Sequence, residues 1–168
     1  MIITFIIIYF LQSNFFSWFT ISKVMPNLFV MYILIIGLFA GRRIGIISGV
    51  IFGLILDFLS SDSIGQTAVL FGLVGLLGGK LEKNFSKDSK MTLILMTIVV
   101  TIAYETIKYF LIVAINEITA EILPFIKIIL IECIYNSILL IIMCPIIKKA
   151  GYAIEKTFKT REMLTRYF

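Results

Sequence analysis

The segment 41–57 constrains this chain most, because small or acidic residues recur in it at every fourth position: Gly45, Gly49, Gly53 and Asp57. Residues four apart lie on one face of an α-helix. Glycines on such a face let a neighbouring backbone approach closely, as they do in membrane helices. In a soluble helix each interior glycine would cost roughly 1 kcal/mol relative to alanine. The segment therefore predicts a packing helix in a membrane, whose glycine face binds either a partner's transmembrane helix or another helix of the same protein, with Asp57 closing the face near its far end.

Composition supports a membrane location. Of the 168 residues, 60% are hydrophobic, and the mean hydropathy is +1.07, whereas a soluble domain is about 45–50% apolar. The net charge of +5 comes from lysines and arginines in short loops and the tail, which indicates membrane topology rather than binding of nucleic acid.

The chain contains no histidine, which removes the usual general base and the commonest metal ligand. Serines and threonines have no partner base, and the glycine-rich stretch 72–79 lies in an apolar segment without the strand–loop–helix context of a phosphate loop. We therefore expect no enzymatic activity, no metal and no cofactor.

Apolar segments predict an all-α integral membrane protein, a six-helix transmembrane bundle. A perpendicular span takes roughly 20 residues, so the second and third segments are short. Fusing them would bury Arg42 and Arg43 at a cost of several kcal/mol, and a tight turn at 41–43 is the better interpretation. The segments cover about 2–21, 27–40, 44–59, 64–81, 91–115 and 123–147, in a membrane domain of residues 1–149.

The basic residues predict the orientation. With a cytoplasmic N-terminus, 12 of the 15 lysines and arginines fall on the cytoplasmic side, in the turn 41–43, the loop 80–90 and the tail from 148. This distribution follows the positive-inside rule. We therefore expect both termini in the cytoplasm, with Arg42 and Arg43 as cytoplasmic anchors. The basic tail 150–168 is compatible with an amphipathic helix on an anionic leaflet, and a frayed, solvated tail fits equally well.

Asp57 lies where the macrodipole of its own helix disfavours a negative charge. A helix-end carboxylate near water and a polar anchor for a partner or ligand are both open interpretations. In either case the unfavourable interaction between this carboxylate and the macrodipole indicates a hydrogen-bond donor nearby, such as a backbone amide of the following loop.

Five further polar residues fall within predicted spans. Glu105 and Lys108 are three apart and share a helix face, which favours mutual pairing over an ion pathway. Glu132 and Asn136 share a face of the sixth segment, and Tyr135 adjoins them. Hydrogen bonds between helices are the simpler role for these groups, and a central cavity that they line is the alternative.

The order of short motifs over essentially the whole chain resembles MreD, the rod-shape-determining membrane protein family of bacteria. The residues that carry the resemblance are Pro26-Asn27, Arg42-Arg43, the glycine face leading to Asp57 and Gly65, Tyr135-Asn136, and Pro145. The family often has Asp where this chain has Asn27.

The resemblance implies a non-catalytic scaffold subunit of the cell-wall elongation complex in the bacterial cytoplasmic (inner) membrane, needed for rod shape and lateral peptidoglycan synthesis. Its implied partner is MreC, a bitopic protein, and through it the MreB filament, RodA and the RodA transpeptidase. The family is also similar in architecture to the S components of energy-coupling-factor transporters. A small-molecule-binding transporter subunit of that kind is therefore the alternative function, although the AxxxA signature of the S components is absent from the first segment.

Overall fold

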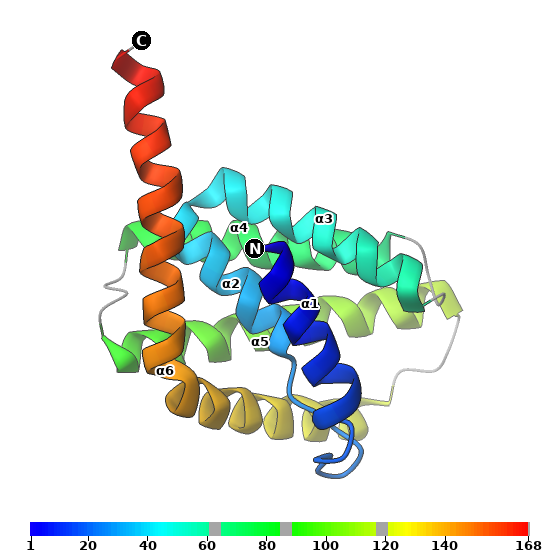
Figure 1. The fold of residues 1–168 in the computed structure, drawn as a ribbon. Helices are drawn as coiled ribbons and strands as arrows, with labels where there is room; N and C mark the ends of the chain where they lie inside the picture. The colour runs from blue at the N-terminus through cyan, green and yellow to red at the C-terminus, as the bar shows by residue number, and fades with distance from the viewer. Residues whose placement is uncertain (61–64, 85–88, 117–120, 168) are drawn as a thin grey trace.

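The computed structural model describes the backbone of residues 1–60, 65–84, 89–116 and 121–167, and their side chains except at 83, 84, 116 and 159–167. In this part of the chain six α-helices form one bundle (Figure 1), and no strand forms apart from a single bridge between Ile21 and Val24. The helices are α1 (Ile2–Phe10), α2 (Leu28–Ala40), α3 (Arg42–Ser60), α4 (Gln66–Asn84), α5 (Lys90–Asn116) and α6 (Ile122–Tyr167), and a π-helical turn, η1 (Leu11–Phe15), follows α1. The predicted all-α fold with six helices is confirmed.

Helix α2 lies at the centre of the bundle. It contacts each of the other five helices, and residues 28–39 are all buried. A helix that is apolar on every side suits such a position. Its 13 residues are too few to cross about 30 Å of hydrocarbon, and the neighbouring helices rather than lipid surround them.

Three helices in the described part of the chain are long and apolar enough to cross a membrane. They comprise Arg42–Ser60, Lys90–Ile115 and Ile122–Phe158. The segments Ile2–Phe15 and Leu28–Ala40 are shorter apolar helices, and α4 is a 19-residue helix of lower hydropathy. The exposed residues of this bundle include many large apolar side chains, as expected of a protein that lipid surrounds.

The first helix is shorter than the predicted segment 2–21, because helical structure ends at Phe15. The Gln12 side chain leaves this helix to bond the chain at the start of α2, and Ser17 donates a hydrogen bond of 3.0 Å to the carbonyl of Asn14. Such side-chain bonds to the backbone compete with the helical ladder. The polar run 12–14 therefore lies in the last helical turn of this segment, η1.

Helix α6 joins the predicted sixth segment and the predicted tail into one helix of 46 residues. The helix changes direction along its length (Figure 1), and Pro145, which lacks the N–H of a regular ladder, lies inside it. Beyond the proline, Gly151 is buried against the ring of Phe39 in α2. The part of the tail up to 158 is thus tied to the bundle.

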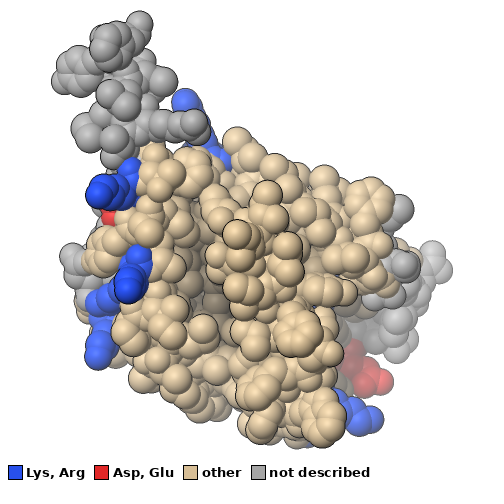
Figure 2. Space-filling model, in the orientation of Figure 1, with Lys and Arg blue, Asp and Glu red and all other residues tan. Residues whose placement is uncertain are grey.

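Charge is unevenly distributed over the surface. Figure 2 shows blue basic side chains gathered at the end where α2 turns into α3, and a broad uncharged middle. Arg42 and Arg43 are exposed at this end, and Gly41, with a φ of 87°, makes the turn between the two helices. Lys87, which belongs to the predicted basic loop, lies outside the described residues.

Candidate functional site: a polar cluster between α2, α5 and α6

The glycine face of α3 packs against α4. A Cβ atom added at Gly45 would lie 2.6 Å from the carbonyl oxygen of Gly75, and one at Gly49 or Gly53 would run into the backbone of Phe71 or Ala68. The two backbones are therefore too close for any side chain on this face. Because α4 covers the glycines, they do not form an open surface for a second protein.

Asp57 closes the same interface by capping α4. Its carboxylate accepts hydrogen bonds from the backbone N–H groups of Gly65 (2.9 Å), Thr67 (3.1 Å) and Ala68 (3.2 Å), and the residue is only 3% exposed. The macrodipole conflict at the C-terminus of α3 is offset here, because the positive end of α4 faces the carboxylate. Asp57 therefore holds Gly65 and the start of α4 against the end of α3.

A second polar connection joins three helices at the start of α2. The backbone N–H of Asn27 donates to the Asn136 side chain of α6 at 2.9 Å, and Asn136 in turn donates to the hydroxyl of Thr101 in α5 at 3.1 Å. Gln12 accepts from the N–H of Leu28 at 3.1 Å and donates to the carbonyl of Pro26 at 2.8 Å. These bonds satisfy backbone groups that the helix start leaves unpaired.

Charged groups lie beside this connection. Lys108 and Glu105 of α5 form an ion pair of 3.2 Å, with the Glu105 side chain 7% exposed and that of Lys108 40% exposed. Glu132 of α6 is 4% exposed, and its Oε1 atom has no hydrogen-bond partner. All three residues line a cavity of about 350 Å³. The predicted pair of Glu105 and Lys108 is thus present, and Glu132, for which lining a cavity is the alternative role, lines this one.

Tyr135 and the arginine pair lie outside this cavity. The hydroxyl of Tyr135 donates at 2.6 Å to the carbonyl of Phe19, which ties α6 to the chain between η1 and α2. Arg42 and Arg43 start α3 at the opposite end of that helix from Ser60, a residue that lines the cavity. Among the described residues, no group of three or more histidine, cysteine or acidic side chains lies close enough to hold a metal.

Sequence reasoning missed Gln12 and Thr101 as partners in the polar cluster. For Thr101 the sequence does carry a signal, since Thr97, Thr101 and Glu105 recur at every fourth residue of α5 and so share one helix face. In the structure all three are buried. For Gln12 the only signal was a polar residue inside an apolar segment, which does not indicate a partner.

Comparison with known proteins identifies the family of this chain. A family model described as rod shape-determining protein MreD matches residues 1–150. The chain belongs to the MreD family. It is therefore a rod shape-determining membrane protein, with a family role in cell shape. No curated protein and no solved structure matches the chain.

Two of the hydrogen bonds described above join residues of the MreD motifs. Four residues of the motifs that carry the MreD resemblance form two hydrogen-bonded pairs, Asn27 with Asn136 and Asp57 with Gly65. Each pair fixes one end of a helix of the bundle. These residues of the MreD pattern thus act within the fold of this chain.

Proposed function

We propose that this MreD-family chain is a non-catalytic scaffold of the cell-wall elongation complex, and that it acts by binding a bitopic MreC-like protein. The support is the family match over residues 1–150 together with a large apolar groove in the bundle. Through that partner the chain would connect with the MreB filament, RodA and the RodA transpeptidase. The chain would lie in the bacterial inner membrane with both termini in the cytoplasm, as the basic end of the bundle favours.

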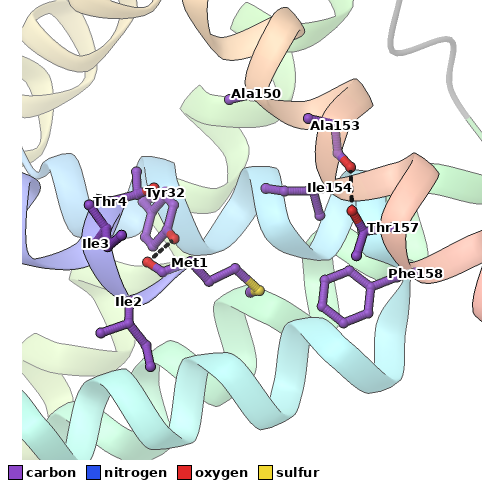
Figure 3. Close-up of a pocket in the computed structure, with 10 residues that line it drawn as sticks. All are labelled: Met1, Ile2, Ile3, Thr4, Tyr32, Ala150, Ala153, Ile154, Thr157 and Phe158. Carbon is purple, nitrogen blue, oxygen red and sulfur yellow. Dashed lines mark hydrogen bonds between the residues drawn. The ribbon is translucent and has the colours of Figure 1, made fainter.

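The groove lies between the start of α1 and the segment 150–158 of α6, and Figure 3 shows it in close-up. Its volume is about 800 Å³, and most of its lining is apolar. Two of the polar side chains on its walls are already engaged, since Tyr32 donates to the carbonyl of Met1 at 2.8 Å and Thr157 donates to that of Ala153 at 2.9 Å. The groove therefore offers shape and apolar contact rather than hydrogen bonds.

A transmembrane helix of a partner fits these properties. In lipid, helices associate through close packing of side chains, and small residues at the contact allow it. Ala150 and Ala153 supply small residues on the α6 wall. Because α4 already covers the α3 glycines, the α1–α6 groove is the surface that we propose for the partner.

Photo-crosslinking in native membranes tests the proposal. A photoreactive amino acid placed at Ile3 or Ile154, which line the groove, should give adducts with a single-span protein. The matched control is Ile51, a residue of α3 that is 50% exposed and lies outside the groove. Adducts from Ile51 but not from the groove, or none from any position at normal membrane levels, would count against this function.

A further inference from the structure

We propose that the cavity beside Glu132 binds a small ligand through a primary ammonium or guanidinium group of that ligand. This site lies apart from the α1–α6 groove, so a failed partner test would leave it standing. The observations behind it are that Oε1 of Glu132 is buried without a donor, and that Glu132 lines a cavity with polar and aromatic walls.

The cavity lies between helix ends. Its lining comes from Gln12, the chain 23–27, Ser60 of α3, Thr67 of α4, and the facing sides of α5 and α6. Its volume of about 350 Å³ is at the lower end of the range for ligand pockets, roughly 300–1,000 Å³. A molecule the size of a small amine fits, whereas a large cofactor does not.

The distribution of charge favours a cation. An unpaired carboxylate away from water is costly, and a hydrogen-bonded cation offsets that cost. Lys108 does not bond Oε1 of Glu132, which has no hydrogen-bond partner, and the Lys108 ammonium group donates to Glu105 at 3.2 Å. The other lysine at the cavity is Lys23, which is exposed. Oε1 of Glu132 is thus the carboxylate oxygen at this cavity that lacks a donor among the described residues.

The aromatic walls suit a cation as well. Phe29, Phe71 and Tyr104 all line the cavity, with ring centroids 6.2 Å apart for the first two and 6.0 Å for the last two. The Lys108 amine already lies 5.6 Å from the Tyr104 ring. Aromatic faces attract ammonium and guanidinium groups, and aromatic rings around a positive group are a known recognition mode. A carboxylate beside three rings therefore matches an organic cation better than an anion.

The position indicates where the ligand comes from. Ser60 and Thr67 mark the end of the bundle opposite the Arg42-Arg43 turn. In the proposed orientation this end faces away from the cytoplasm. The ligand would therefore enter from the outer side of the membrane.

Calorimetric titration of the full chain in lipid nanodiscs tests the site, with n-butylamine and agmatine as cationic probes and n-butanol as the uncharged one. Both cations should bind and n-butanol should not. Glu132→Gln should weaken binding of the cations about ten- to hundredfold, since a hydrogen bond to a charged group contributes roughly 1.5–3 kcal/mol. Glu121→Gln, at an exposed acid just before the same helix, should bind as the wild type does.

Lys108→Met should change the affinity for the amines in the opposite direction from Glu132→Gln. It removes the competing cation and leaves Glu105 as a second free carboxylate, so the amines should bind more tightly. General damage to the bundle would weaken binding in both variants, and if Glu132→Gln does not fold, Lys108→Met decides alone. Equal affinity in the wild type and the folded variants, or binding of n-butanol as strong as that of n-butylamine, would overturn the proposal.

Discussion

The backbone N–H of Asn27 donates a hydrogen bond of 2.9 Å to Oδ1 of Asn136, 109 residues further along the chain. Asn136 is fully buried, and its amide group continues the connection to Thr101. One side chain of α6 thereby joins the first turn of the central helix to α5. This hydrogen bond adds a polar contact to the apolar packing that surrounds α2.

Replacing Asn136 by Leu should lower the free energy of unfolding by about 1–3 kcal/mol. The variant leaves the N–H of Asn27 and the hydroxyl of Thr101 buried without their partner, and each such group carries a desolvation penalty of that order. Unfolding in mixed micelles would measure the loss. Asn14→Ala is the control, because Asn14 is exposed and bonds only its own helix. Equal stability of the two variants would contradict the role assigned to Asn136.

Asp57→Ala should destabilise the bundle more than Asp57→Asn. The alanine variant loses all three bonds to the start of α4, whereas the amide oxygen of asparagine still accepts one or two of them. Losing a helix cap lowers the free energy of unfolding by about 0.5–2 kcal/mol. Hydrogen bonds to a charged carboxylate are stronger than those to a neutral acceptor, so the alanine variant should lose at least this much. Thermal unfolding in detergent would rank the two, and an alanine variant as stable as the wild type would refute the cap.

Two glycines of α4 should respond differently to alanine. A Cβ at Gly75 would overlap the backbone of Gly45 in α3, whereas one at Gly72 would meet only the side-chain Cγ2 of Val50, at 3.0 Å. Backbone cannot move aside as a side chain does, so Gly75→Ala should separate α3 from α4 and cost about 1–3 kcal/mol or more. The amount of folded protein in membranes and the unfolding midpoint measure the difference. Similar midpoints would mean that the interface is looser than described.

Filling the α1–α6 groove should abolish partner binding without loss of the protein from the membrane. Ala153→Trp places a large ring in the groove, and Ile146→Trp places the same ring on the 64% exposed side of the same helix. Only the first variant should lose co-purification of the single-span partner and fail to restore rod shape in cells that lack the native protein. Normal shape with Ala153→Trp would exclude the groove as the contact surface.

Cysteine accessibility should report the orientation. In a background with Cys133 and Cys144 replaced by alanine, a membrane-impermeant thiol reagent added outside should label Lys23→Cys but not Lys156→Cys, which is exposed on the part of α6 next to the basic end. Permeabilised cells should give labelling at both positions. The reverse pattern would invert the proposed topology.

Much of this architecture followed from the sequence alone. The excess of apolar residues, the order of six helices and a turn within 41–43 came from local patterns, whereas the MreD resemblance rested on the order of motifs along the whole chain. Local patterns suffice there, because helix formation in lipid requires only a continuous apolar run whose backbone bonds itself. The turn predicted over 41–43 is shorter in the structure, because Gly41 alone makes it and α3 begins at Arg42.

The tertiary structure decided which surface each helix gives to the bundle and which to lipid. Lipid and the protein interior are both apolar, so periodicity of hydrophobic residues does not distinguish them in a membrane protein. Nothing local shows that the short α2 is the central helix, that α4 covers the α3 glycines, or that Asn136 bonds Asn27. These contacts join residues far apart in the chain, and only the packing of whole helices brings them together.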